Sequence, residues 1–270
     1  MIRIVILTGS ELRHVFFRKY VAAHGDIQVT NSYCEGLEKS LYNFTSVDRN
    51  NYFRLKHLEA REQTEEDFFK LFIESQDDDS RPVPLPKGQI NDEKYTQKII
   101  DSNPDLLICY GSSIIKEPLL TFFKNRFLNV HLGLSPYYRG SGTNYWPFVN
   151  EEPEYAGATF MHIDAGIDTG EIIHQIRPKY SWNDTPSQIG TRFIVDMARE
   201  YLKIIINFNS LPTVSPLDSS GDYKLYRTKD YSEDSAKILY ENFENGLIKK
   251  YLEEEEERCA KVPIINNPAL

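Results

Sequence analysis

Two stretches of this chain share a pattern that strongly limits its fold. A continuous apolar run, Ile2–Leu7, ends in a turn at Gly9, and a second run, 105–110, ends in a turn at Gly111. Helical spacing follows the first turn, and a helix is also expected after the second. Strands that are apolar on both faces are typical of parallel sheets covered by helices. The pattern predicts an α/β fold with a mostly parallel sheet flanked by helices.

The composition favours a soluble protein of one large α/β domain with an appendage, or of two domains. The chain has 270 residues and a formal net charge of −9, which argues against broad binding to nucleic acid. Cys34, Cys109 and Cys259 are far apart and odd in number, as expected for free thiols in a reducing cytoplasm. No signal peptide or apolar run of about 18 residues is apparent, so no membrane partner is expected.

The remaining patterns give a coarse outline of the chain. Mixed charge and helical spacing in 35–74 predict one or two surface helices. Asp77-Asp78-Asp79 and the prolines at 82, 84 and 86 predict a loop. We also expect strands at 27–33, 127–130, 158–163 and 171–177, helices at 91–101 and 185–207, a linker at 212–222 and a helical segment at 232–257.

An amide and an imidazole lie two residues apart at the end of one predicted strand. Because side chains alternate along a strand, Asn129 and His131 point to the same face. Asp168 lies further along, in a loop that we expect only glycine could bend so sharply. If that loop folds back, Asp168 could orient His131 as a base for an attacking amine. Asn129 could donate to an oxygen that becomes negative, so the three could move an acyl group onto an amine.

Other interpretations of these residues stay open at this point. A lone histidine after a strand is more often structural, and an Asp in a glycine loop more often forms a turn. His131, His162, Asp164 and His174 are all metal-ligand types, but no HExxH or paired-His spacing supports a metal site. No metal is expected.

The two glycine turns could bind a ligand or could be purely structural. GxGxxG is absent, which argues against a dinucleotide fingerprint. The amides of Gly9 and Ser10 at a helix N-terminus could hold an anion, and a plain βα turn is the simpler alternative. Residues 111–115 follow the carboxyl end of a strand, where the crevice of a doubly wound sheet lies, and are a candidate wall of the site.

Four blocks, in order and spacing, resemble the formyltransferase family that uses 10-formyltetrahydrofolate. They are Asn129-Val130-His131, Pro136-Tyr137-Tyr138-Arg139-Gly140, Gly157-Ala158-Thr159 and Ile167-Asp168-Thr169-Gly170. The family includes glycinamide ribonucleotide, methionyl-tRNA and sugar N-formyltransferases. The resemblance implies a Rossmann-like formyltransferase fold, with a catalytic domain at 1–207 and a linker and helical extension at 208–270. The chain departs from the usual pattern at Leu132-Gly133 and at Ser135.

The resemblance also implies roles for individual residues. The catalytic residues would be Asn129, His131 and Asp168, and the formyl donor would be 10-formyltetrahydrofolate. Two loops would hold its pterin, largely through backbone groups: Gly111, Ser112, Ser113, Ile114 and Ile115, and Asp164, Ala165, Gly166 and Asp168.

The acceptor amine is left open by the sequence. Glu11 would repel the phosphate of a glycinamide ribonucleotide, and the short, helical tail disfavours transfer RNA. We therefore expect a small-molecule amine, first an amino sugar on a nucleotide. Three alternatives stay open: glycinamide ribonucleotide as the acceptor, hydrolysis of the formyl donor, and a protein that binds folate or a nucleotide without catalysis. Methionyl-tRNA is a less favoured acceptor. The C-terminal tail could serve to form a homodimer. The candidates for substrate binding are Gly9, Ser10, Tyr137, Tyr138, Arg139, Tyr145 and Trp146. The aromatic residues among them could instead pack the loop.

Overall fold

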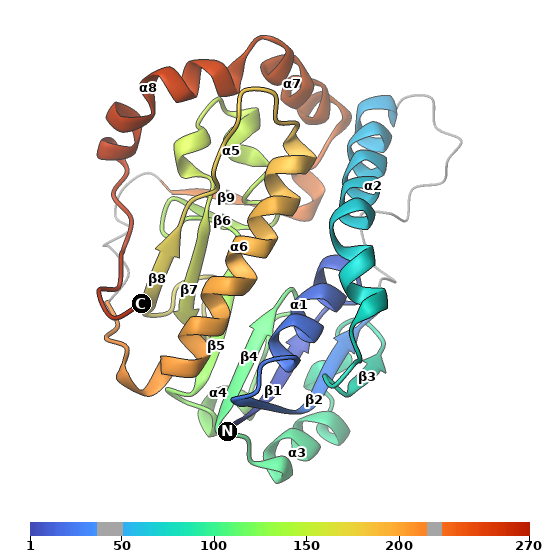
Figure 1. The fold of residues 1–270 in the computed structure, drawn as a ribbon. Helices are drawn as coiled ribbons and strands as arrows, with labels where there is room; N and C mark the ends of the chain where they lie inside the picture. The colour runs from blue at the N-terminus through green and yellow to red at the C-terminus, as the bar shows by residue number, and fades with distance from the viewer. Residues whose placement is uncertain (37–50, 215–222) are drawn as a thin grey trace.

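The computed structural model describes residues 1–36, 51–214 and 223–270. Its centre is a seven-stranded sheet with the order β3-β2-β1-β4-β5-β7-β8 (Figure 1). The five strands from β3 to β5 pair in parallel, whereas β7 and β8 are added by antiparallel pairing. This confirms the predicted mostly parallel sheet. The strands are β1 (Ile2–Thr8), β2 (Ile27–Glu35), β3 (Pro82–Leu85), β4 (Leu106–Tyr110), β5 (Phe127–His131), β7 (Ala158–His162) and β8 (Ile172–Ile176).

Helices cover both faces of the sheet, as its apolar strands require. In β1, Ile4 and Ile6 join a core that includes apolar residues of α1, α2 and α6. Val5 and Leu7 point to the opposite face and pack with apolar residues of α3 and α4. Figure 1 shows α6 running across the first of these faces. The helices are α1 (Leu12–Ala22), α2 (Tyr52–Ser75), α3 (Glu93–Ser102), α4 (Leu119–Phe122), α5 (Trp146–Val149), α6 (Pro186–Asn207), α7 (Glu233–Glu244) and α8 (Leu247–Lys261).

The start of α6 follows from its sequence. Thr185 is the N-cap, and its hydroxyl accepts a hydrogen bond from the Gln188 amide at 3.2 Å. The Gln188 side chain in turn accepts from the Thr185 N–H at 3.0 Å, so two donors at the helix end are satisfied. Pro186 occupies the first turn, where its missing N–H costs nothing. The predicted helix at 185–207 is thus found almost to the residue.

The prediction of a loop through the prolines at 82–86 was wrong for residues 82–85. Pro82 and Pro84 belong to β3, the edge strand that pairs with β2. The carbonyls of Arg81 and Leu85 accept hydrogen bonds from β2 and from Gly36, so the backbone groups of these odd-numbered residues face the sheet. The prolines alternate with them and direct their nitrogens outward, where an edge strand needs no donor.

Residues 224–261 pack beyond the ends towards which the parallel strands point, whereas the last residues run back beside β8 (Figure 1). β9 (Lys224–Tyr226) pairs with β6 (Tyr138–Gly140), and α7 and α8 lie across this end of the molecule (Figure 1). Leu239 and Leu247 form a third apolar core with Phe148 of α5 and Ile189 of α6. The predicted linker at 212–222 lies mostly outside the described residues. Four 3₁₀ turns complete the described elements: η2 (Gln89–Asn91), η3 (Pro153–Tyr155), η4 (Phe208–Ser210) and η5 (Thr228–Asp230).

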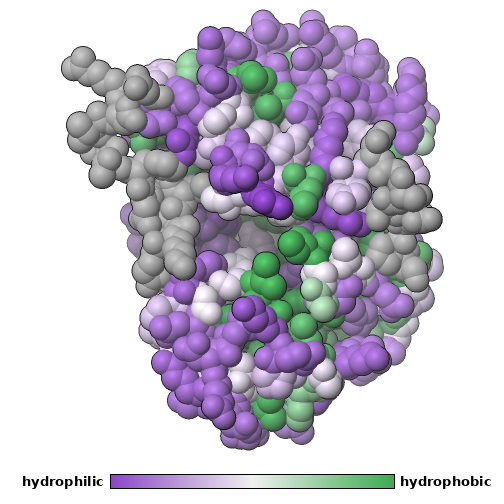
Figure 2. Space-filling view, turned by 180° about the vertical axis from the view of Figure 1, so that it is seen from behind, coloured by the Kyte–Doolittle hydropathy of each residue, from purple (hydrophilic) through white to green (hydrophobic). Residues whose placement is uncertain are grey.

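The face of the molecule seen in Figure 2 is mostly hydrophilic. Figure 2 shows the face opposite to that of Figure 1, which is hollowed near its middle and has hydrophobic side chains beside the hollow. In the described ranges, no helix combines the length and the apolar character that crossing a membrane requires.

Candidate active site

A cavity of about 560 Å³ opens at the carboxyl ends of β4 and β5. Residues of α1, α2 and α6 and the segment 140–146 form most of its wall. Among the residues predicted for the site, it is lined by Asn129, His131, Asp168, Gly111, Ser112, Tyr145 and Trp146. The sheet therefore brings the predicted catalytic residues, which are up to 39 positions apart, to one cavity.

His131 and Asp168 lie in contact. Nδ1 of His131 is 3.3 Å from Oδ1 of Asp168, and both side chains are largely buried. The other oxygen of Asp168 accepts a hydrogen bond from the Gly140 N–H at 3.1 Å. Nε2 of His131 is 3.1 Å from the carbonyl oxygen of Tyr138. Two oxygen acceptors are thus available for the two ring protons of an imidazolium, which is the form that results when His131 takes a proton.

The turn that carries Asp168 differs from the expectation that only glycine could bend it. Asp168 itself has the left-handed conformation, with φ of 54°, which Asp tolerates better than most residues. Gly166 and Gly170 matter for space instead: an added Cβ would collide with Thr169 at the first and with the carbonyl of His162 at the second. The loop is therefore packed tightly around a carboxylate in a fixed position.

Gly133 packs directly against the imidazole of His131. A Cβ at this position would lie 2.5 Å from Nε2 of His131 and 2.7 Å from Cβ of Thr143. The chain therefore needs a residue without a side chain immediately beside the imidazole.

The predicted pterin loop at 111–115 has no regular structure of its own, and two buried or half-buried side chains hold it. Glu35, at the end of β2, accepts hydrogen bonds from the Ser113 N–H at 2.5 Å and the Gly88 N–H at 2.8 Å. Asn91 donates to the Ile114 carbonyl at 3.0 Å and accepts from the Lys116 N–H at 2.8 Å. The side chain of Ile114 is left 65% exposed.

Several predicted residues lie outside the lining of the cavity. In the pterin loops these are Ser113, Ile114, Ile115, Asp164, Ala165 and Gly166, and in the predicted substrate site they are Gly9, Ser10, Tyr137, Tyr138 and Arg139. Tyr138 is buried, and its hydroxyl donates to Glu152 at 2.5 Å. Asp164 accepts from the Gly166 N–H at 2.9 Å and so forms a local turn.

The ligand types of the alternative metal interpretation are not gathered into one cluster. Nε2 of His174 is 3.9 Å from Glu200, on α6, whereas His131 contacts Asp168. Within the described residues, no group of three or more His, Cys, Asp or Glu side chains could hold a metal ion.

The comparisons with known proteins decide the family. Residues 52–204, more than half of the chain, match the family described as formyl transferase. The chain belongs to this family. A methionyl-tRNA formyltransferase from Finegoldia magna is 37% identical over 93 residues, which cover 34% of this chain and 29% of that protein. The chain spans less than half the length of the curated relatives that it matches.

Solved structures of formyltransferases share the fold. A 4-N formyltransferase from Francisella tularensis gives a TM-score of 0.52 with 19% identity, over 85% of this chain and 78% of that one. A phosphoribosylglycinamide formyltransferase from Anaplasma phagocytophilum gives 0.55 with 16% identity, over 83% and 98%. At such identities the likeness concerns the fold alone.

Two parts of the cavity wall in this formyl transferase family member lie outside the matched range of 52–204. The first is the start of α1, which contributes Glu11, Arg13 and His14. The second is the C-terminal segment, which contributes Arg227, Thr228, Tyr231 and Leu239. Sequence reasoning gave Glu11 a role as a charge that would repel a phosphate, and it did not single out the other residues of these two groups.

The C-terminal segment reaches the cavity through aromatic contacts. Tyr226 stacks on Trp146 with ring centroids 4.1 Å apart and planes 7° from parallel. Tyr231 packs edge-on against Tyr145 at 5.3 Å, and the Tyr145 hydroxyl is 2.9 Å from that of Ser235. The extension therefore fixes the two aromatic residues of the loop that line the cavity.

His57 is a second buried histidine in the wall, and the sequence analysis did not single it out. It lies on α2, with its ring 5.3 Å from that of Tyr145. Burial and the nearby charge of Arg61 lower the pKa of His57 to about 3. His57 is therefore neutral at physiological pH. Its Nδ1 has no hydrogen-bond partner among the described residues.

Proposed function

We propose that this chain transfers a formyl group from 10-formyltetrahydrofolate to a primary amine. The observation that carries the proposal is the contact of His131 with Asp168, at 3.3 Å, in a cavity that Asn129 also lines. Membership of the formyl transferase family supports the same reaction. A base, a group that orients it and an amide donor are what direct attack by an amine requires.

Each of the three residues would have one task. The amide of Asn129 donates to the formyl oxygen as it becomes negative during attack by the amine nitrogen. His131 takes the proton that this nitrogen loses when the new C–N bond forms. Asp168 orients the imidazole and stabilises its positive charge. The bond from the formyl carbon to N10 of the folate would then break, and the proton held by His131 would pass to N10, so that tetrahydrofolate leaves.

The cavity wall also suits the formyl donor. A flat pterin needs backbone groups along its edge and apolar contacts on its faces. Gly111 and Ser112 line the cavity with an irregular backbone, and two large apolar side chains, Ile114 and Ile167, are 65% and 50% exposed on the two predicted pterin loops. We therefore place the pterin beside residues 111–115 and the loop of Asp168.

For the acceptor we propose an amino sugar on a nucleotide. Tyr145 and Trp146 offer aromatic surface, and the chain shares its fold with a solved 4-N formyltransferase. Methionyl-tRNA is the second candidate because the curated relatives, such as the Finegoldia magna protein, carry that name.

A comparison of acceptors tests the proposal. The purified chain is incubated with 10-formyltetrahydrofolate and either nucleotide-linked amino sugars, glycinamide ribonucleotide or methionyl-tRNA, and formylated product is detected by mass spectrometry. The proposal predicts product with an amino-sugar nucleotide. If only methionyl-tRNA is formylated, the proposed reaction holds but the proposed acceptor is wrong. If formate is released and no amine is formylated, the chain hydrolyses the formyl donor and the proposed transfer is wrong.

A further inference from the structure

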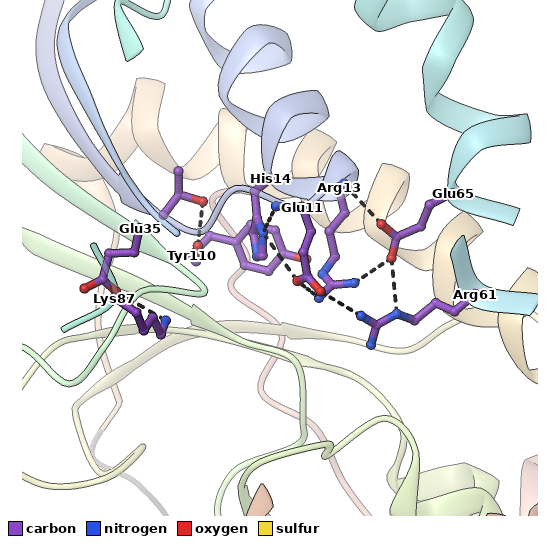
Figure 3. Close-up of polar contacts among 9 residues, drawn as sticks. Glu11, Arg13, His14, Glu35, Arg61, Glu65, Lys87 and Tyr110 are labelled. Carbon is purple, nitrogen blue, oxygen red and sulfur yellow. Dashed lines mark hydrogen bonds and ion pairs between the residues drawn. The ribbon is translucent and has the colours of Figure 1, made fainter. Parts of the chain in front are cut away.

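Four charged side chains from α2 and the start of α1 form one network on the wall of the cavity (Figure 3). Glu11 contacts the guanidinium of Arg13, and its other oxygen accepts from Nη2 of Arg61 at 2.8 Å. Glu65 accepts from Nη1 of Arg13 at 2.5 Å and lies 3.6 Å from Nε of Arg61. Among the residues that the structure describes, two carboxylates and two guanidiniums therefore alternate, and the formal charges of these four cancel.

Two titratable groups beside this network, His14 and Tyr110, are uncharged. Burial, reinforced by the positive charges of Arg13, Lys87 and Arg61, lowers the pKa of His14 well below its usual value, so its ring is neutral. The Nδ1 of this ring accepts a hydrogen bond from the Glu11 N–H. Burial also raises the pKa of Tyr110, which keeps its hydroxyl protonated.

The carboxylate of Glu11 occupies the place that an anionic ligand would take. It lies at the N-terminus of α1, and both guanidiniums of the network bind it. Two arginines beside a helix N-terminus would otherwise form a phosphate site. Burial alone would lower the pKa of Arg13, but Glu65 and Glu11 outweigh it and raise that pKa, so the guanidinium remains charged and paired.

We infer that Glu11 is a specificity-determining residue that supplies an internal anion to Arg13 and Arg61. As a result, this end of the cavity takes an uncharged, hydroxyl-bearing part of the acceptor and rejects a phosphate group. As a statement about the acceptor, the inference rests on the proposed function. The internal pairing corrects the simpler expectation that Glu11 acts as an unpaired negative charge.

Binding of inorganic phosphate tests the inference without any formyl transfer. Calorimetry compares the wild type with Glu11→Gln, which keeps the shape of the side chain and leaves the network with one net positive charge. We expect no saturable phosphate binding to the wild type at millimolar concentration. Glu11→Gln should bind phosphate at least about tenfold more tightly, and raising the salt concentration should weaken this binding.

Three further variants keep the test decisive. Glu65→Gln gives the same net charge but leaves the Glu11 carboxylate in place, so it should bind phosphate no better than the wild type. Glu11→Ala serves if Glu11→Gln does not fold, as judged by circular dichroism. The double variant Glu11→Gln/Arg13→Gln is neutral again and should lose the new binding. Phosphate binding by the wild type overturns the inference. So does a folded Glu11 variant that binds phosphate no better than the wild type, or a Glu65→Gln variant that binds it as tightly as Glu11→Gln.

Discussion

Replacing Gly133 by alanine should damage catalysis through a displacement of His131. The added methyl group would lie 2.5 Å from Nε2 of His131, whereas ordinary contacts begin at 3.4 Å. Thr143 closes the other side, with its Cβ 2.7 Å away, so the methyl group cannot turn aside. The imidazole therefore has to move by about 0.9 Å.

The size of this displacement sets the expected loss. A shift of about 1 Å in a catalytic group can cost roughly a hundredfold in rate, so we expect kcat of Gly133→Ala to fall about a hundredfold. Overpacking of this kind also costs about 1–3 kcal/mol of stability. The two effects have to be separated because a partly unfolded enzyme would also be slow.

Gly157→Ala is the matched control. Its added methyl group would collide with Leu134 and with the carbonyl of Ile176, and no contact with His131 is among its close ones. Initial rates at saturating substrates, normalised to the folded fraction from thermal unfolding, compare the two variants. We expect Gly157→Ala to lose stability and keep its kcat. If Gly133→Ala retains the wild-type kcat, or if both variants lose kcat equally, the argument from the position of the imidazole is wrong.

Three further predictions follow from contacts around the cavity. Glu35→Gln should weaken the hydrogen bond from the Ser113 N–H and lower the free energy of unfolding by about 2 kcal/mol. It should raise KM for the formyl donor more than KM for the acceptor, and an equal rise in both KM values would contradict this. Tyr226→Ala removes the ring stacked on Trp146 and should raise KM for the acceptor selectively, which steady-state kinetics would detect or refute. The folded-state pKa of His57, about 3, lies below its ordinary value of 6.5, so the unfolded chain gains a proton first and stability falls as the pH drops through this window. Tm of His57→Phe should therefore fall less steeply than that of the wild type between pH 6.5 and about 4, and parallel curves would refute the assignment.

The sequence was most informative where the physical rule is local. Alternation along a strand placed Asn129 and His131 on one face, and both line the cavity. The apolar runs predicted the buried strands of the sheet, and the helical spacing of apolar residues in 185–207 predicted α6. The approach of Asp168 to His131 also needed the two segments to meet in space. The residues alone offered that as one possibility, and only the family resemblance implied it.

Features that depend on tertiary neighbours were harder to predict. His57, Arg61 and Glu65 recur every four residues and so share one face of α2, a signal that the sequence does carry. Nothing local shows that this face meets Glu11 and Arg13 of α1 to form a neutral network.

Similarly, the wall formed by the C-terminal segment could not be derived from periodicity. Tyr226 reaches the site because β9 pairs with β6, which lies more than eighty residues earlier in the chain. Pro82 and Pro84 led to the wrong prediction of a loop for a related reason. Prolines are acceptable in β3 only because it lies at the edge of the sheet.

The most direct test of the central claim is the amine dependence of folate turnover in the wild type and in His131→Ala. Release of tetrahydrofolate from 10-formyltetrahydrofolate is followed with and without the acceptor amine, and circular dichroism verifies the fold of the variant. The account predicts release only when the amine is present, and a loss of about a thousandfold in His131→Ala. Near-wild-type turnover by a folded His131→Ala variant, or full release without any amine, would contradict it.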